Sequence, residues 1–263
     1  MINHKDICLK VVELSQSTGK NLKKLRNQQT PEAESKGKND FVTQFDKDTE
    51  ALLIEALSKI LPHSGFIAEE NTSDKKGATH NWIIDPIDGT TNFIHGLYPW
   101  CISIALMENE EMVVGVVYEA GLDECFYAWK GGGAFLNHEK ITVSSRPRVA
   151  DSLIATGFPY TNFNLMDQFI ESLHFFMKNS HGMRRLGSAA ADLAYVACGR
   201  LDAFYEYDLK PWDVAAGALI IQEAGGKISD FSGGNNYLYG REIIASNQLV
   251  FDEFHTKVSK FLK

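Results

Sequence analysis

The sequence predicts an α/β protein of the α+β kind, built from two halves, and three patterns along its 263 residues lead to this prediction. Apolar residues recur at helical spacing over 4–29, and apolar and polar residues alternate between turn residues over 100–143. Beyond that stretch, strand-like and helix-like segments follow one another. We therefore expect an N-terminal α+β domain over 1–145 and a C-terminal α/β domain over 146–263.

The N-terminal half opens with the long amphipathic helix over 4–29. The polar stretch "TPEAESKGKNDF" follows it and is expected to form a mobile loop. A second helix is expected over 46–60, because acids occupy its first turn and a proline follows its end. Two short strands come next: "SGFIA", which leads into Glu69-Glu70, and "NWIID", which ends at Asp85.

The remaining elements follow from the same two periodicities. The stretches "CISIALM", "MVVGVVYEA", "ECFYAW" and "KITV" are predicted to be antiparallel strands. In the C-terminal half, strands are expected at "SLIATG", "HGMRRLG" and "DAFYEY". Helices are expected between and after them, at "LMDQFIESLHFFMKN", "SAAADLAYVACG" and "PWDVAAGALIIQEAGG".

Composition narrows the class of protein. Apolar residues make up 44% and charged residues 23%, as in ordinary globular proteins, and the net charge of −8 argues against nucleic acid as the main partner. The four cysteines are scattered without a CxxC pair, which argues against a thiolate metal site or a disulfide framework. The N-terminus lacks a signal-peptide core, and no stretch reaches the roughly 20 apolar residues of a membrane span. We therefore expect a reduced, cytoplasmic protein that binds no membrane.

The stretch "WIIDPIDGTTNF" places two carboxylates where a predicted strand ends. Pro86 fixes its own φ and keeps Asp85 extended, so we expect the chain to turn there. Asp88, Gly89 and the two threonines then look like a turn that enters a helix, whose free N–H groups can meet an anion. Asp-Gly turns and Asp helix caps are also common without a ligand, so this stretch alone leaves both interpretations open.

Acidic residues recur at two similar places. Glu69-Glu70 also ends a predicted strand, and Asp213 lies in the first turn of a predicted helix that opens with a proline. Oxygen-rich sites with few histidines suit Mg²⁺ or Mn²⁺ better than zinc or copper. Together with Asp85 and Asp88, these acids would suffice for two ions that assist in-line hydrolysis of a phosphate ester.

These motifs together resemble the inositol monophosphatase family of metal-dependent phosphatases. The first motif is joined by "AEE" upstream and by "GMRRLGSAAADLAYVACGRLDAFYE", "PWDVAAG" and "EAGGKISDFSGG" downstream, in the family's order over about residues 40–250. The resemblance implies a layered αβαβα sandwich, of the inositol monophosphatase/fructose-1,6-bisphosphatase type, with the site between the halves. It also implies a homodimer and two or three Mg²⁺ per site, with Mn²⁺ as a substitute and Ca²⁺ or Li⁺ as inhibitors.

The resemblance implies a role for each acid. A first metal would be held by Glu69, Asp85 and the backbone carbonyl of Ile87, with help from the Thr90 hydroxyl. A second would be held by Asp88 and Asp213, with Asp85 as the bridge. The catalytic residues implied by the family are Asp46, which pairs with Thr90 to orient the attacking water, and Glu70, an acid close to the metals.

Substrate contacts follow from the same resemblance. The turn Asp88-Gly89-Thr90-Thr91 would cradle the phosphate, and Gly187-Ser188-Ala189 would meet sugar hydroxyls, although Ser188 could also be a plain helix cap. Glu206 would bind polyol hydroxyls, or else is a solvated charge at a strand end. Lys210 stands where some members carry histidine, and Lys36 or Lys38 is expected to match a lysine on a loop near the metals.

The function implied is hydrolysis of inositol monophosphate and related small sugar or polyol phosphates by direct attack of a metal-activated water. Fructose-1,6-bisphosphate, NADP and histidinol phosphate remain alternative substrates within the superfamily. A different class of function, that of an interaction partner without catalysis, is disfavoured because a binding module does not need the whole acidic set.

Overall fold

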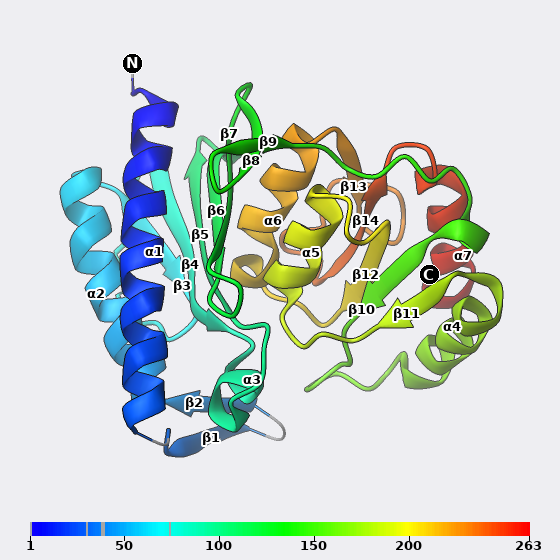
Figure 1. The fold of residues 1–263 in the computed structure, drawn as a ribbon, viewed down its shortest axis with the longest axis horizontal. Coiled ribbons are helices and arrows are strands. Elements are labelled where there is room, and N and C mark those ends of the chain that lie inside the picture. Colours follow the sequence, from blue (N-terminus) through cyan, green and yellow to red (C-terminus); the bar gives the residue numbers. More distant parts are fainter. Residues whose placement is uncertain (1, 30, 38–39, 74) are drawn as a thin grey trace.

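The computed structural model describes residues 2–29, 31–37, 40–73 and 75–263, and their helices and strands stack in five layers (Figure 1). Two sheets alternate with three layers of helices, which confirms the αβαβα sandwich. Helices α1 and α2 cover the larger sheet, α5 and α6 lie between the sheets, and α4 and α7 cover the smaller one. The helices are α1 (His4–Gln28), α2 (Gln44–Ile60), α3 (Thr90–His95), α4 (Met166–Asn179), α5 (Ala189–Ala197), α6 (Pro211–Glu223) and α7 (Phe251–Leu262), with a short 3₁₀ helix (Val149–Asp151).

The larger sheet has seven strands that lie side by side in sequence order. β3 pairs parallel to β4, and all later neighbours pair antiparallel, which confirms the antiparallel strands predicted over 100–143. In the glycine-rich "KGGGAF", the first three residues form the turn between β7 and β8 and the last three begin β8. The strands are β3 (Gly65–Ala68), β4 (His80–Asp88), β5 (Cys101–Glu108), β6 (Glu111–Glu119), β7 (Glu124–Trp129), β8 (Gly133–Leu136) and β9 (Glu139–Ile141).

The smaller sheet has five strands in the order β11-β10-β12-β14-β13. Its strands follow the larger sheet's in the sequence, yet one apolar core joins the two sheets through α5 and α6, with Val117, Leu193 and Phe204 among its members. The division at residue 145 into two domains therefore stays a prediction. The strands are β10 (Leu153–Thr156), β11 (Gly182–Arg184), β12 (Ala203–Tyr207), β13 (Gly226–Ser229) and β14 (Glu242–Asn247).

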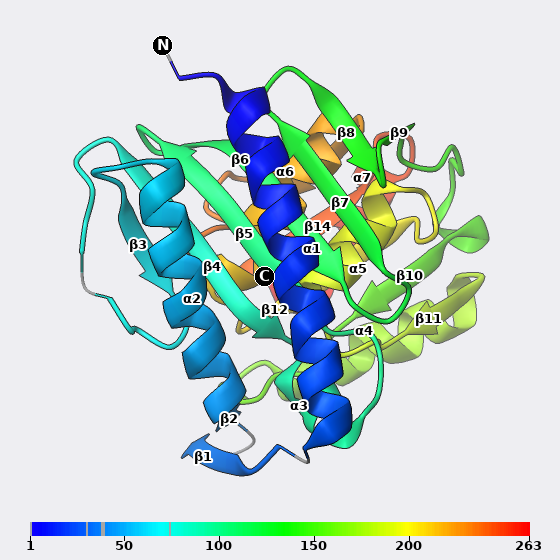
Figure 2. The same ribbon diagram turned by 60° about the vertical axis from the view of Figure 1, so that its left-hand side comes forward.

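Helix α1 crosses the outer face of the larger sheet and buries one face against it (Figure 2). Ile7, Val11 and Leu22 lie on that buried face, and Asn3 caps the N-terminus by accepting a hydrogen bond from the Asp6 backbone N–H. Across the described residues, no helix combines the length and the apolar character that crossing a bilayer requires.

Helix α2 carries two carboxylates into the protein. Its buried face contains Asp46 and Glu50 as well as Leu53 and Leu57, so acids occupy positions that packing alone would fill with apolar side chains. Asp46 closes a capping box, because its carboxylate accepts the backbone N–H of Thr43 at 2.7 Å. Both acids matter for the site described below.

The prediction of a mobile loop between α1 and α2 is wrong for the described residues. β1 (Ala33–Gly37) and β2 (Asp40–Thr43) pair antiparallel, and this pairing satisfies backbone groups that a loop would leave to water. Lys38 lies outside the described residues, and only the backbone of Lys36 is described, as part of β1. The expectation that one of these lysines reaches the site stays a prediction.

Candidate metal centre

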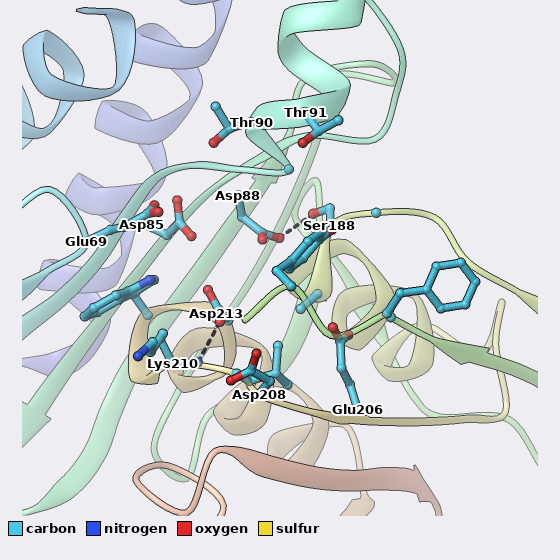
Figure 3. Close-up of a pocket in the computed structure, with 18 of the residues that line it drawn as sticks. Glu69, Asp85, Asp88, Thr90, Thr91, Ser188, Glu206, Asp208, Lys210 and Asp213 are labelled. Carbon is cyan, nitrogen blue, oxygen red and sulfur yellow. Dashed lines mark hydrogen bonds between the residues drawn. The ribbon is translucent and has the colours of Figure 1, made fainter. Parts of the chain in front are cut away.

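A pocket of about 370 Å³ opens where several strands end and three helices begin (Figure 3). The end of β4 and the start of α3 form one part of its wall, and the starts of α5 and α6 form others. The carboxylates of Asp85, Asp88 and Asp213 point toward one another inside it, and Glu69 lies beside Asp85 (Figure 3). The fold thus gathers the acids predicted from separate motifs, as their placement at strand ends and helix starts implied.

Strand β4 presents Asp85 and Asp88 to the same pocket through an irregularity. Residues three apart on a regular strand face opposite sides of the sheet. Here the register with β5 shifts between Asp85 and Asp88, which pair with Ser103 and Cys101. Pro86 lies inside this bulge, where its missing N–H breaks no regular ladder. The prediction that the strand ends at Asp85 is therefore wrong, since the bulge lets pairing resume at Asp88.

Asp85, Asp88 and Asp213 form a tight acidic cluster. One carboxylate oxygen from each residue lies within 4.8 Å of the other two. Burial raises the pKa of Asp85 well above its usual range, and the charges of Glu69 and its other acidic neighbours raise it further. Burial and the charge of Asp88 raise the pKa of Asp213 in the same way. The cluster is therefore costly to ionise unless a cation compensates its charge.

The first turn of α5 holds Asp88 in place. The Asp88 carboxylate accepts a hydrogen bond from the Ser188 hydroxyl and another, at 2.8 Å, from the Ala190 backbone N–H. Burial raises the pKa of Asp88 to about 6, although these two hydrogen bonds act in the opposite direction. Ser188 also caps α5 by accepting the backbone N–H of Ala191 at 3.2 Å. One serine therefore both starts the helix and orients an acid from the other half of the chain.

Asp213 is oriented by the start of α6. Pro211 occupies the first helical position, and the Asp213 carboxylate accepts the backbone N–H of Lys210 at 2.7 Å (Figure 3). The N-terminal end of the helix dipole favours a carboxylate there by about 0.3–1 kcal/mol. This local stabilisation holds the side chain in place whether or not a metal is bound.

The donor set of this cluster fits a hard divalent cation. It offers oxygen atoms alone, as Mg²⁺ and Mn²⁺ prefer, and no histidine or cysteine belongs to the cluster that the described residues form. Burial, and then mutual repulsion among the acids, raise the pKa values of Asp85 and Asp213, and a bound cation would relieve that repulsion. Asp85, Asp88 and Asp213 could therefore hold metal.

Thr90 connects the cluster to helix α2. Its hydroxyl lies 2.9 Å from the carbonyl oxygen of Ile87 and 3.2 Å from Oδ1 of Asp46, and it can donate its one proton to either. The Asp46 carboxylate is fully buried and also accepts the Thr43 hydroxyl, at 2.6 Å. The predicted pairing of Asp46 with Thr90 is confirmed as a contact, and its catalytic role stays a prediction.

All nine residues predicted to contact substrate line the pocket. The residues that do so are Asp88, Gly89, Thr90, Thr91, Gly187, Ser188, Ala189, Glu206 and Lys210. Gly89 has φ of +92°, a conformation that glycine adopts without strain, and it serves as the N-cap of α3. Glu206 is buried, at 6% exposed, so the alternative of a solvated charge at a strand end is wrong.

Two predicted catalytic residues lie outside the pocket wall that the described residues form. Glu70 follows Glu69, and its backbone N–H donates to Glu50 at 2.7 Å. Asp46 lies behind Thr90, which separates it from the pocket. The catalytic role predicted for Glu70 stays a prediction, because its place in the fold neither excludes nor requires it.

Four residues of this region received no role from the sequence. Arg185 and Asp192 line the pocket, Gly157 lies against Glu206, and Glu50 anchors the chain after β3. A carboxylate in the otherwise apolar "SAAADLAYVA" was a usable signal for Asp192, and so was the place of Glu50 in the apolar stripe of α2. No local pattern marked Gly157.

Comparison with known proteins extends over nearly the whole chain. The model of the inositol monophosphatase family matches residues 6–262. The inositol-1-monophosphatase of Mesorhizobium japonicum is 42% identical over 216 residues, which cover 82% of this chain and 81% of that protein. The Nus factor SuhB of Escherichia coli (strain K12) is 42% identical over 230 residues, or 86% of each protein.

Solved structures show the same similarity. The extragenic suppressor protein suhB of Bartonella henselae has a TM-score of 0.90 and 38% sequence identity, and the match covers 95% of this chain and 97% of that one. The similarity therefore spans both sheets and every element that lines the pocket.

Proposed function

The chain belongs to the inositol monophosphatase family, and from this membership and the acidic pocket we propose that it is a Mg²⁺-dependent phosphatase of inositol monophosphate and related small polyol phosphates. The observation that carries the proposal is the cluster of Asp85, Asp88 and Asp213, whose oxygens lie within 4.8 Å of one another. A phosphatase needs positive charge beside the phosphate of its substrate, and these buried acids are arranged to bind the cations that supply this charge.

The metal ligands proposed are those of the cluster together with Glu69 and the carbonyl oxygen of Ile87. When bound, two or three Mg²⁺ ions supply positive charge that stabilises the phosphate oxygens and lowers the pKa of water. The chain itself fixes the ligands before metal arrives: Ser188 and Ala190 hold Asp88, and the Lys210 amide holds Asp213. This preorganisation supports the proposal, because it lowers the cost of arranging ligands around each ion.

Thr90 and Asp46 are proposed to orient the attacking water. In this proposal the Thr90 hydroxyl donates its proton to Asp46 rather than to the Ile87 carbonyl, and its oxygen accepts a hydrogen bond from the water. As the water oxygen attacks phosphorus in line, the water gives up one proton and the bond from phosphorus to the ester oxygen breaks, and the departing oxygen takes up one proton from solvent. Alcohol and inorganic phosphate result, with no phosphorylated enzyme on the way.

The remaining pocket residues are proposed to bind the two ends of the substrate. Gly89, Thr90 and Thr91 at the start of α3 face the phosphate end, together with Asp88. Gly187, Ser188, Ala189, Glu206 and Lys210 face the polyol end. Their presence in the wall of one pocket supports contact of both groups of residues with a single substrate.

Phosphate release tests the proposal. Wild-type protein and the Asp85→Asn variant are incubated with myo-inositol 1-phosphate, with Mg²⁺ and with chelator. We expect Mg²⁺-dependent release that the variant loses by about 100-fold or more. Fructose 1,6-bisphosphate, NADP and histidinol phosphate in the same assay test the alternative substrates. Absence of release from every ester by folded, Mg²⁺-loaded protein contradicts the proposal.

A second candidate function comes from the names of relatives. The Escherichia coli relative is named Nus factor SuhB, so a role in a protein assembly, separate from hydrolysis, is the alternative for this chain. The Asp85→Asn variant discriminates between the two. A cellular phenotype that survives this change while hydrolysis is lost assigns the biological role to the assembly.

We further propose two properties that the family implies for this protein: assembly as a homodimer and inhibition by Li⁺. The molar mass in solution tests the first, against the 29.4 kDa of one chain. Phosphate release across a Li⁺ titration tests the second.

A further inference from the structure

Asp192 is a buried carboxylate in the pocket wall to which no role has yet been assigned. It lies in the first turn of α5 and is 1% exposed. Within the part of the chain that the structure describes, its Oδ1 is buried without a hydrogen-bond partner. A buried polar atom without a hydrogen-bond partner is unfavourable, so a ligand that donates a hydrogen bond to Oδ1 would be stabilised at this position.

Helix capping does not account for Asp192. The Ser188 side chain already caps α5 through the Ala191 N–H, and Asp88 accepts the Ala190 N–H. The backbone N–H of Asp192 itself donates to the Ser188 carbonyl at 3.0 Å. The helix start is therefore satisfied without the Asp192 carboxylate, and alanine at this position would continue the preceding run of three alanines.

Two charged side chains share this part of the pocket with Asp192. Glu206 is 6% exposed, and burial and the charge of Asp192 raise its pKa well above the usual range. Arg185 lies against the aromatic rings of Phe158 and Tyr160, with its guanidinium carbon 5.3 and 5.7 Å from their centroids, and it also donates to the Tyr160 hydroxyl. Its Nε is buried and has no hydrogen-bond partner in the described structure. Among the described residues, the Oδ1 of Asp192 can therefore still accept a hydrogen bond and the Nε–H of Arg185 can still donate one.

The chemistry of this wall suits a neutral group rich in hydroxyls. Burial favours the neutral form of Glu206, and a carboxyl group can bond to a hydroxyl whether or not it is ionised. A hydroxyl can donate to a carboxylate and accept from the Arg185 Nε–H, so neighbouring hydroxyls of one polyol can complete both unpaired atoms. Gly157 leaves the room that this requires, since a Cβ there would lie 1.9 Å from Oε1 of Glu206.

We propose that Asp192 is a specificity-determining residue that accepts a hydrogen bond from a hydroxyl of the substrate's polyol part, beside the hydroxyl bound by Glu206. This inference rests on the proposed function. It assigns the preference for polyol monophosphates over esters without hydroxyls to Asp192 as well as to Glu206.

Calorimetric binding with Ca²⁺ in place of Mg²⁺ tests the proposal without turnover. The ligands are myo-inositol 1-phosphate and cyclohexyl phosphate, which share the phosphate and the ring but differ in hydroxyls. We expect Asp192→Ala to weaken binding of the inositol ester by about 10- to 100-fold, the usual effect of a hydrogen bond to a charged group, and that of the cyclohexyl ester by less than about 2-fold. The control is Asp167→Ala, which removes an exposed first-turn acid from α4 and should change neither affinity.

Three results overturn the proposal: equal weakening of both ligands, no weakening of either, and no binding of the inositol ester by the wild type. Phosphate release by the wild type with Mg²⁺ is measured separately, so failure of the phosphatase function is seen independently of the binding result. If Asp192→Ala does not fold, single-deoxy analogues of myo-inositol 1-phosphate decide the matter with the wild type. At least two analogues should bind about tenfold more weakly, because Asp192 and Glu206 take one hydroxyl each, and weakening with at most one overturns the proposal.

Discussion

Asp46 and Glu50 lie one helical turn apart on α2, both fully buried, and each accepts hydrogen bonds from a different segment of the metal centre. Asp46 accepts from Thr90 at 3.2 Å, and Glu50 accepts from the backbone N–H of Glu70 at 2.7 Å. One face of one helix therefore positions both the proposed water-orienting hydroxyl and the chain that carries Glu69.

The first prediction concerns Glu50. Its carboxylate also accepts the backbone N–H and the hydroxyl of Thr72, at 2.8 and 2.7 Å, so Glu50→Gln places an amide N–H against these donors. We expect a loss of about 1–3 kcal/mol in the free energy of unfolding and a higher Mg²⁺ concentration for half-maximal activity. Denaturant unfolding and a Mg²⁺ titration measure the two effects.

The matched control is Glu55→Gln on the same helix. Glu55 is exposed and pairs with Lys59 at 2.6 Å, and surface pairs of this kind contribute little. Equal behaviour of the Glu50 and Glu55 variants would show that the buried contacts to Glu70 and Thr72 do not position the metal ligands.

The second prediction concerns the Thr90 hydroxyl. Thr90→Val keeps the shape of the side chain but removes the hydroxyl that contacts Asp46, and we expect the catalytic rate to fall by about 10²- to 10⁴-fold. Thr90→Ser keeps the hydroxyl and should stay within about tenfold of the wild type. Steady-state phosphate release at saturating Mg²⁺ measures both, and a valine variant as active as the serine variant refutes the role.

The third prediction is a pH dependence of metal-free stability. Burial raises the pKa of Asp88 from 3.8 to about 6 in the folded state. Between these two pH values, the Asp88 carboxyl is protonated in the folded protein and ionised in the unfolded protein. This contribution to stability is present below pH 3.8 and is lost as pH rises through about 6. In chelator, the wild type should therefore lose about 1.4 kcal/mol per pH unit relative to Asp88→Asn across that window.

Thermal or denaturant unfolding of both proteins between pH 4 and 8 measures this difference. Above about pH 7 the difference should be constant in chelator, and saturating Mg²⁺ should remove the loss of stability that the wild type shows as pH rises, since a cation takes the place of the proton. A difference that stays flat across the whole range in chelator would mean that Asp88 titrates normally.

The fourth prediction concerns Gly157. A Cβ at this position would lie 1.9 Å from Oε1 and 2.2 Å from Oε2 of Glu206, so Gly157→Ala must displace that buried carboxylate. We expect KM for myo-inositol 1-phosphate to rise about tenfold with little change in kcat, because the metal cluster is untouched. The same variant tested on cyclohexyl phosphate is the control, and an equal rise in KM for both esters argues against a contact to the polyol.

Most of the helices and strands and the candidate metal ligands could be predicted from short stretches of the sequence. Helical spacing predicted α1 and α2 closely, alternation predicted the strands over 100–143, and the acids of the metal centre were proposed because each stands at or near a predicted strand end or helix start. Such features depend on the residues within one or two turns, so a single stretch of chain is enough to specify them.

Only the tertiary structure determined the features that depend on contacts between residues far apart in the sequence. The hairpin of β1 and β2 was missed because its strands are short, and they are stabilised by pairing with each other and by contacts of β2 with α2 and α3. Three further features likewise follow from how segments far apart in the chain pack: the bulge at Pro86, the burial of Glu50 behind Glu70, and the Oδ1 of Asp192, which has no hydrogen-bond partner among the described residues. Burial and hydrogen bonding are properties of the packed molecule, so a local pattern can mark a residue such as Glu50 or Asp192 as unusual but cannot identify its partners.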